Sequence, residues 1–408
     1  MSRADLPPRT HAALPDYPTY REALAGQHLP AAFVDLDQFD ANLADLKRRA
    51  RGLPIRLATK SLRSRELIAA ALAGGPFMQG LLCYSAAEAA WLADSGFDDI
   101  VVAYPGVEPD DLRAVAAQSR RGRSITLMVD AAAQVDAIAR IARDEAVTIP
   151  LAIDLDMSSA YPGLHFGMYR SPVRDVAAAL TLANHIGDQE QVRLAGLMGY
   201  EGQIAGLADM TPGGGARNAL IRVLKRRSAR EVNARRQAVV RALAEAGHAL
   251  RFVNGGGTGS FESTLDDPSV TELAAGSGLY APALFDHYAA FHARPAAGFA
   301  LPVTRIPRPG MATCSGGGYI ASGPAGPSRL PSPWLPAGCT LVRNEGAGEV
   351  QTPLRLPRGF RPAIGDPVLF RHAKAGELCE RFNSLLLIRD GRVIGETPTY
   401  RGDGKSFF

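Results

Sequence analysis

A single lysine, Lys60, follows directly after the short apolar stretch Ile55 to Ala58. That stretch predicts a β-strand, and a helical segment begins just beyond the lysine. In α/β barrels the carboxyl ends of the parallel strands carry the catalytic groups. A lysine in such a place can form a Schiff base when its surroundings favour the neutral amine. For any one lysine a surface position beside a loop is the more common case, so this interpretation depends on the rest of the chain.

Two glycine-rich segments later in the chain are candidates for binding a phosphate group. The first, residues 254–259, directly follows an apolar stretch, and the second spans residues 272–280. Backbone N–H groups of such loops can bind phosphate, and barrels often build a phosphate site from their last loops. Neither segment contains the G-K-[ST] of a P-loop, and both come too late in the chain for a Rossmann fingerprint. The residues concerned are Asn254, Gly256, Gly257, Thr258, Gly276 and Ser277.

Short apolar stretches alternate with helical stretches over most of the chain. Residues 85–95, 131–143, 173–186 and 228–246 are rich in Ala, Leu, Arg and Glu, as expected for helices. Such alternation indicates parallel strands joined by right-handed crossovers. Eight strands favour a closed (β/α)8 TIM barrel, with an open sheet as the alternative. The predicted strands are 32–36, 55–59, 77–82, 100–104, 124–129, 149–155, 194–199 and 250–254.

The sequence changes character at about Arg294. Helical periodicity ends, and proline and glycine become frequent between short apolar stretches. The pair Asp390-Gly391 lies between two such stretches, which predicts a β-hairpin. We therefore expect an N-terminal arm over residues 1–29 that packs on the β domain, a barrel over 30–295 and an all-β domain over 296–408.

Composition and charge argue against several classes of protein. The chain has 408 residues and a formal net charge of +4, which is too small to indicate a nucleic-acid partner. The basic stretch 221–236 has no interleaved aromatic residues and is expected to be a solvated helix face. The uncharged stretch 67–87 is interrupted by Gly74-Gly75-Pro76, so we expect no membrane span. The start of the chain lacks the apolar core of a signal peptide, and four widely spaced cysteines predict a reduced, cytoplasmic protein.

The order of these segments resembles a known enzyme family. Lys60, the segment 199–202 (Gly-Tyr-Glu-Gly) and the two glycine-rich loops are similar to the alanine-racemase-like, fold-type III pyridoxal phosphate enzymes. Within that family the branch of D-threonine aldolases and D-serine dehydratases fits best. The resemblance implies that Lys60 bonds covalently to pyridoxal 5'-phosphate. It also implies a homodimer, a small amino-acid substrate, and phosphate contacts from Tyr200, Gly256, Gly257, Thr258, Gly276 and Ser277, with Asn254 beside them.

The same resemblance raises two further expectations. His165 falls where the family carries an arginine that faces the pyridine nitrogen, so His165 is expected near the cofactor. Enzymes of the aldolase and dehydratase branch hold a divalent metal with a His and a Cys or Asp two positions later. Here His372 and Cys379 are seven positions apart, and we expect them to bind zinc or manganese, with Glu377 as an alternative ligand. The alternative is a buried cysteine beside an ion-paired histidine.

The expected activity is that of a metal-assisted lyase on D-configured β-hydroxy amino acids. Polarising the β-hydroxyl would permit either retro-aldol cleavage or elimination of ammonia, and the sequence does not choose between them. An amino-acid racemase is the second possibility, with Tyr319 as the nearest candidate for a second base. A non-catalytic carrier of the cofactor is the third. Cys314 is expected to be structural rather than to face a partner's site, and His287 and His292 to be ordinary surface or helix residues.

Overall fold

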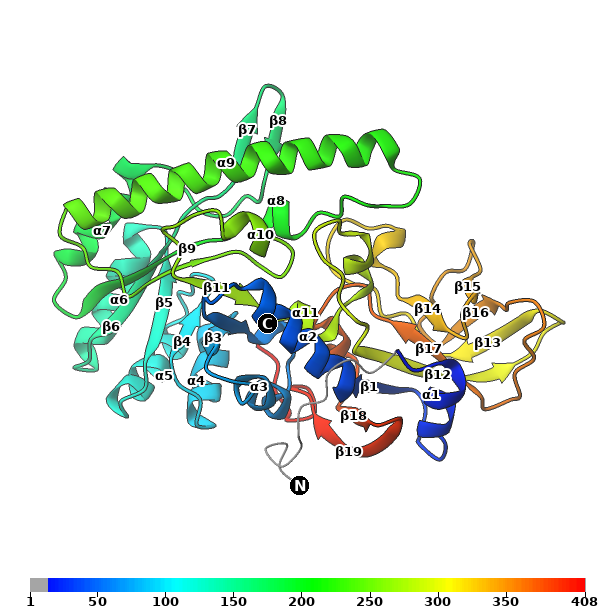
Figure 1. The fold of residues 1–408 in the computed structure, drawn as a ribbon. Helices are drawn as coiled ribbons and strands as arrows, with labels where there is room; N and C mark the ends of the chain where they lie inside the picture. Colours follow the sequence, from blue (N-terminus) through cyan, green and yellow to red (C-terminus); the bar gives the residue numbers. More distant parts are fainter. Residues whose placement is uncertain (1–13, 408) are drawn as a thin grey trace.

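The computed structural model describes residues 14–407, which form a barrel and, beside it, a β domain (Figure 1). Within that range eight parallel strands close into a barrel, so the predicted TIM barrel is confirmed. Their side chains are almost all buried, as expected for strands covered on both faces. In order around the barrel the strands are β2 (Ile55–Ala58), β3 (Met78–Cys83), β4 (Ile100–Val102), β5 (Ile125–Val129), β6 (Ile149–Asp154), β9 (Val192–Gly199), β10 (Phe252–Gly255) and β11 (Glu272–Ala275).

Strand β1 (Ala31–Asp35) is not a barrel strand, and the prediction that it opens the barrel is wrong. It pairs parallel with β18 (Ser384–Arg389) and antiparallel with β12 (Ala297–Arg305), in the sheet of the β domain. The barrel therefore begins at β2, and its eighth strand is β11, which pairs with β2 and closes the ring. Lys60 thus follows the first barrel strand rather than the second.

Helices surround the barrel, as their amphipathic sequences predict. Local signals fix several of their ends: Ser85, for example, begins a helix by accepting a hydrogen bond from the backbone N–H of Glu88. A small hairpin, β7 (Ser159–Tyr161) and β8 (Leu164–Phe166), stands out beside the longest helix (Figure 1). The helices are α1 (Tyr17–Ala23), α2 (Leu36–Arg49), α3 (Arg65–Leu72), α4 (Ala86–Asp94), α5 (Pro109–Arg120), α6 (Ala132–Asp144), α7 (Val176–Gly187), α8 (Gly202–Ala205), α9 (Gly215–Glu245), α10 (Phe261–Thr264) and α11 (Ser277–Tyr280).

The strand-rich C-terminal region is confirmed as well. Its hairpin at Asp390-Gly391 forms as predicted, with both residues at positive φ, 49° and 68°, as a tight two-residue turn requires. The remaining strands of this region are β13 (Met311–Ser315), β14 (Ser332–Leu335), β15 (Thr340–Leu341), β16 (Gln351–Arg355), β17 (Pro367–Arg371) and β19 (Arg392–Pro398).

The N-terminal helix α1 packs on the β domain, and the C-terminal segment after β19 packs on the barrel. In α1 the hydroxyl of Tyr17 donates to the carbonyl of Pro367 at 3.0 Å, and the ring of Tyr20 lies 5.4 Å from that of Trp334. Residues 1–13 of the predicted N-terminal arm lie outside the described residues. After β19 the chain returns to the barrel, where the backbone N–H of Tyr400 donates to the carbonyl of Arg63 at 2.8 Å.

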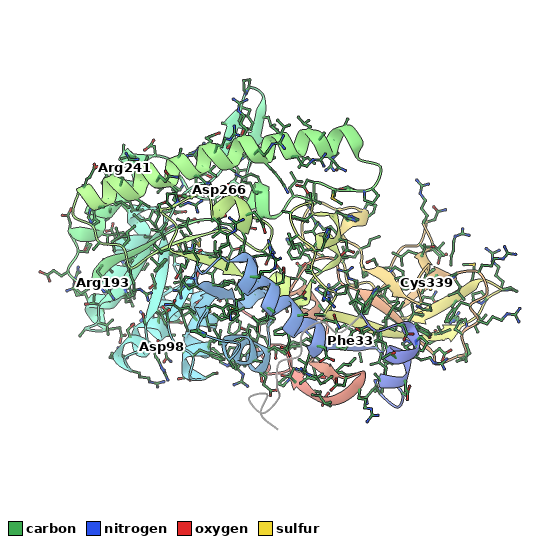
Figure 2. All side chains as sticks on the ribbon, viewed as in Figure 1. Phe33, Asp98, Arg193, Arg241, Asp266 and Cys339 are labelled. Atoms are coloured by element: carbon green, nitrogen blue, oxygen red, sulfur yellow. The ribbon has the colours of Figure 1, made fainter. Side chains whose placement is uncertain are left out.

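Figure 2 shows the two parts through labelled side chains. Phe33 of β1 and Cys339 lie on the side of the β domain, while Asp98 and Arg193 lie on the barrel side. Cys339 is one of four cysteines that are buried and free of disulfide bonds. In residues 14–407 no helix is both long and apolar enough to cross a lipid bilayer.

The basic stretch 221–236 is not a wholly solvated face, contrary to expectation. It lies in α9, where Lys225 is buried and its ammonium pairs with the carboxylate of Asp209 at 3.2 Å. Arg236 is fully buried, and its guanidinium pairs with Asp267 at 2.9 Å and with Glu201. These buried charges are tolerated because each one has a carboxylate partner.

Candidate active site

A cavity opens at the carboxyl ends of the barrel strands, between the barrel and the β domain. Lys60, in a short 3-10 turn (Thr59–Ser61) directly after β2, lines it. Most of the predicted site residues converge on this cavity although they lie up to 217 positions apart. The predicted residues that line it are Lys60, Tyr200, Asn254, Gly256, Gly257, Thr258, Gly276 and Ser277.

The amine of Lys60 has a tyrosine hydroxyl as its neighbour. Nζ of Lys60 donates to the hydroxyl of Tyr104 at 3.1 Å, and it lies 5.5 Å from the centre of that ring. Burial raises the pKa of Tyr104, but the positive charges of Lys60 and Arg170 outweigh this, so the net pKa is lowered. The cavity therefore holds an amine and a hydroxyl between which a proton can move.

The two glycine-rich loops leave room that a side chain would fill. A Cβ at Gly257 would lie 3.1 Å from the ring of Tyr200, and one at Gly276 would lie 2.3 Å from the carbonyl oxygen of Ala58. Gly256 has a φ of +76°, which favours glycine. The hydroxyls of Thr258 and Ser277 lie 3.5 Å apart, so the loops meet at one place. Such a small-residue cradle fits the phosphate of pyridoxal phosphate.

A buried carboxylate holds the first of these loops. Glu201 accepts a hydrogen bond from the backbone N–H of Gly256 at 2.9 Å, and it also pairs with Arg236. Deeper in the barrel, Asn254 donates to Glu272 at 2.9 Å, and Glu272 in turn pairs with Arg56 at 2.7 Å. The cradle therefore rests on charged groups that are themselves fully paired.

Arginine 170, rather than His165, reaches the cavity. His165 lies in the β7–β8 hairpin, where its ring stacks on Tyr169 at 4.0 Å, and the structure does not bring it to the cavity. Arg170 lines the cavity wall, and its guanidinium lies 4.8 Å from the ring of Tyr104. Asp154 accepts from Arg170 at 3.1 Å, and burial raises the pKa of Asp154 to about 6, although the arginine acts in the opposite direction.

The predicted metal ligands do not form a metal site among the described residues. His372 is buried, and neither ring nitrogen has a hydrogen-bond partner among the described residues. Burial lowers its pKa to about 3, and the charge of Arg371 adds to this, so the imidazole is neutral. The thiol of Cys379 donates instead to the carbonyl of Leu62 at 3.2 Å, and burial raises its pKa to about 12.

The donor chemistry around this pair does not fit a divalent cation. A thiol binds zinc as the thiolate, which burial disfavours at Cys379. Glu377, the alternative ligand, accepts from the backbone N–H of Ser322 at 3.0 Å. Over residues 14–407 no group of three His, Cys, Asp or Glu side chains is placed to hold a metal ion. His372 could serve as one ligand, but its expected partners are engaged elsewhere, so we derive no chemical step through a metal here.

The remaining predicted candidates lie outside the cavity. Cys314 is fully buried in β13, as expected for a structural cysteine. Tyr319 packs its ring 5.0 Å from that of Phe299 and lines a separate hollow beside His372. The backbone carbonyl of His287 accepts from the N–H of Asp209 at 3.0 Å, and His292 is exposed.

The chain matches a known protein family. Residues 34–283, more than half of the chain, match the model of the family described as alanine racemase, N-terminal domain. The chain belongs to this family. The match includes Lys60 and both glycine-rich loops, and enzymes similar to the chain include two aldolases and a dehydratase.

Two curated relatives and one solved structure are similar to the chain. The D-threonine aldolase of Arthrobacter sp. is 27% identical over 267 residues, which are 65% of this chain and 64% of that enzyme. The D-threo-3-hydroxyaspartate dehydratase of Delftia sp. is 30% identical over 33% of this chain and 35% of its own. The chain thus aligns with less than two thirds of either relative. The D-threonine aldolase structure from Filomicrobium marinum superposes on this chain with a TM-score of 0.77, over 92% of this chain and 95% of its own, at 20% sequence identity. At this identity the superposition shows a shared fold and no more.

Sequence reasoning missed four polar residues of the cavity: Ser61, Tyr104, Arg170 and Lys374. Tyr104 lies two positions after the end of β4, so the strand-end rule that found Lys60 could also have found it. Arg170 comes from a segment after the β7–β8 hairpin, which no periodicity predicts. Lys374 comes from the β domain, and nothing local in the sequence shows that this loop meets the barrel.

Proposed function

We propose that this protein is a pyridoxal-phosphate-dependent lyase that acts on D-configured β-hydroxy amino acids. One observation carries the proposal: Lys60 opens onto the same cavity as the glycine cradle of residues 256–258 and 276–277. An amine that shares a cavity with a cradle of small residues is the arrangement that this cofactor needs. The substrate class and its D configuration come from the relatives, a D-threonine aldolase and a D-threo-3-hydroxyaspartate dehydratase.

In this proposal the chain's own residues bind the cofactor and move protons. Pyridoxal phosphate, when bound, supplies an electron sink for negative charge at the Cα of an amino acid. Lys60 would hold it covalently, and the small residues of the cradle would surround its phosphate. Arg170, held by Asp154, would place a fixed positive charge at the cavity wall. Lys60 and Tyr104, joined at 3.1 Å, would take and return the protons of the substrate.

A homodimer belongs to the same proposal. Lys60 and Lys374 are both exposed in a single chain, whereas reactions at Cα profit from a site that excludes water. A second copy covering the cavity mouth would provide that exclusion, and light scattering would show it as twice the mass of one chain.

A cytoplasmic location is proposed because all four cysteines are buried and free. A zinc or manganese requirement is not carried into the proposal, because the donors at His372 and Cys379 do not fit it.

Product analysis tests the proposal. The purified protein is given D-threonine, D-serine and D-threo-3-hydroxyaspartate, and the products are identified by chromatography. Glycine plus an aldehyde, or ammonia plus a 2-oxo acid, would support a lyase and would distinguish cleavage from elimination. Accumulation of the enantiomer alone would instead identify a racemase. In parallel, Lys60→Ala should abolish the visible absorbance of covalently bound cofactor, while Lys47→Ala, on the surface of α2, should retain it.

A further inference from the structure

A second lysine faces the cavity from the β domain. Lys374 lies in the loop between β17 and β18 and lines the cavity together with Lys60 and Ala375. Its ammonium donates to the hydroxyl of Ser322 at 3.2 Å. The neighbouring Gly376 packs directly against the backbone of Lys60, where a Cβ would lie 1.9 Å from the carbonyl oxygen. This contact fixes the loop, so the position of Lys374 at the cavity is determined by the fold.

Lys374 has no ion-pair partner in residues 14–407 of the structure. Among carboxylates, Glu377 has the largest charge effect on Lys374. Its two oxygens, however, accept from the backbone N–H of Ser322 at 3.0 and 3.1 Å. Of the other described groups whose charge acts on Lys374, Lys60 and Arg329 are positive, and the hydroxyl of Tyr104 is the one acidic group. The surroundings of Lys374 are therefore short of negative charge.

Arg329 adds a second cation close to Lys374, because its carbonyl accepts from the N–H of Ala321 at 2.8 Å, and Ala321 directly precedes Ser322, to which Lys374 donates. Nε and one terminal nitrogen of Arg329 are buried, and no partner for them lies within the described part of the chain. The deeply buried arginines of the barrel, in contrast, each pair with carboxylates, as Arg56 does with Glu272. A guanidinium without a partner is costly unless an anion arrives.

We propose that Lys374, supported by Arg329, binds the side-chain carboxylate of the substrate, so that this chain acts on dicarboxylic β-hydroxy amino acids. The inference rests on the proposed function and narrows it. An α-carboxylate, which every amino-acid substrate carries, neutralises one positive charge. Lys374 and Arg329 are two cations without a carboxylate partner among the described residues, since Glu377 is turned toward Ser322. If the α-carboxylate neutralises one of them, the other positive charge needs a second anionic group. Carboxylates are the usual partners of such Lys and Arg pairs.

Substrate selectivity of matched variants tests the inference. The value of kcat/KM is measured for D-threo-3-hydroxyaspartate and for D-serine with wild type, Lys374→Met, Lys374→Arg and the surface control Lys47→Met. Wild type and Lys47→Met should prefer the dicarboxylate. In Lys374→Met the ratio of the two kcat/KM values should fall by about tenfold or more, and Lys374→Arg should restore most of it. Arg329→Gln should lower the ratio in the same direction. An equal loss on both substrates would overturn the inference, because Lys374 would then serve the common α-carboxylate or the fold.

A binding measurement separates this inference from the proposed lyase activity. Succinate has two carboxylates and no amine to react, and acetate has one. Calorimetry on the cofactor-loaded protein should show succinate binding more tightly than acetate, and Lys374→Met should remove the difference. If no β-hydroxy amino acid is cleaved but succinate still binds through Lys374, the proposed function fails and the anion site stands. Equal affinity for succinate and acetate in the wild type would overturn the anion site itself.

Discussion

The α-carbon of Gly376, in the β domain, lies so close to Lys60 that a Cβ added to it would stand 1.9 Å from the lysine's carbonyl oxygen. Gly376 also has a φ of +84°, a conformation that side-chain-bearing residues rarely adopt. Through this contact the β domain touches the backbone of the predicted cofactor lysine. A shift of the Gly376 loop in the β domain would therefore move Lys60 in the barrel.

Replacing Gly376 with alanine should separate the loop from Lys60. The Cβ would collide with a backbone oxygen rather than a flexible side chain, so either the loop or the turn of Lys60 must move. We expect a loss of stability of about 2 kcal/mol or more, and a lower kcat/KM as Lys60 shifts. Chemical denaturation and steady-state kinetics measure the two effects.

Gly365→Ala is the matched control for that variant. Gly365 has a similar φ of +93° in the same domain, but nothing lies within 4 Å of its added Cβ. It should therefore suffer the backbone strain alone, about 1 kcal/mol, and keep its activity. Equal effects of the two substitutions would show that contact with Lys60 has no particular importance.

Replacing Glu201 with glutamine should weaken the glycine cradle. Glu201 is buried, accepts from the N–H of Gly256 at 2.9 Å and pairs with Arg236. The neutral amide leaves Arg236 with Asp267 alone, which should cost about 2–3 kcal/mol of stability. We also expect cofactor affinity to fall by about tenfold, measured by absorbance titration of the dialysed protein.

The comparison for Glu201 is Glu231→Gln in α9. Glu231 pairs with Arg235 at 3.0 Å, but its side chain is 39% exposed, so the loss should be about 0.5 kcal/mol or less, with unchanged cofactor affinity. If Glu201→Gln bound the cofactor as tightly as this control, the cradle would not depend on the buried carboxylate.

The barrel was predictable from the sequence because its strands are short, apolar and regularly spaced. Seven of the eight predicted strands are barrel strands, and the eighth, β1, has the same apolar character but pairs with β18 some 353 positions later. Local pattern cannot reveal a partner so distant. The true eighth strand, β11, begins with Glu272, a charged residue that looks like a loop until its buried pairs with Arg56 and Asn254 are seen.

The site was predictable only where the chain's own strand ends build it. Lys60 and the glycine loops follow barrel strands, so their meeting in one cavity follows from the fold. Lys374 enters from the β domain, and Arg170 from beyond a hairpin. The spacing of His372 and Cys379 does not tell that the thiol is oriented toward Leu62. These placements depend on how separate elements pack, which the local sequence does not encode.

Removal of divalent cations should have little effect on the activity. The protein dialysed against a chelator should keep its activity within about twofold and retain far less than one zinc per chain, since no complete donor set is formed. Elemental analysis and kinetics check this. Stoichiometric zinc that disappears in His372→Ala, but persists in the surface control His248→Ala, would contradict it.

The pH dependence of stability should carry the signature of Glu88. This carboxyl group is fully buried in α4, and it accepts from the N–H of Tyr84 at 2.7 Å and from the hydroxyl of Tyr400 at 2.9 Å. Burial raises its pKa from 4.5 to about 7, and its hydrogen bonds only partly offset this. Between these two values the folded protein binds a proton that the unfolded chain has released. Stability from this group is therefore full below pH 4.5 and decreases as pH rises to about 7, by about 3 kcal/mol in total.

Glu88→Gln should remove that slope. Its amide oxygen can still accept from the N–H of Tyr84, and its NH2 can donate to the hydroxyl oxygen of Tyr400, so the variant imitates the protonated acid at every pH. We expect denaturation midpoints of the wild type to fall between pH 4.5 and about pH 7 relative to those of Glu88→Gln, which should change less. Because Tyr400 also donates its backbone N–H to Arg63, three positions after Lys60, the same titration should loosen the C-terminal segment beside the active site. Hydrogen exchange of residues 399–405, corrected for the intrinsic rate, checks this. The exchange rate should rise with pH in the wild type and not in Glu88→Gln. Identical profiles in both proteins would locate the titrating group elsewhere.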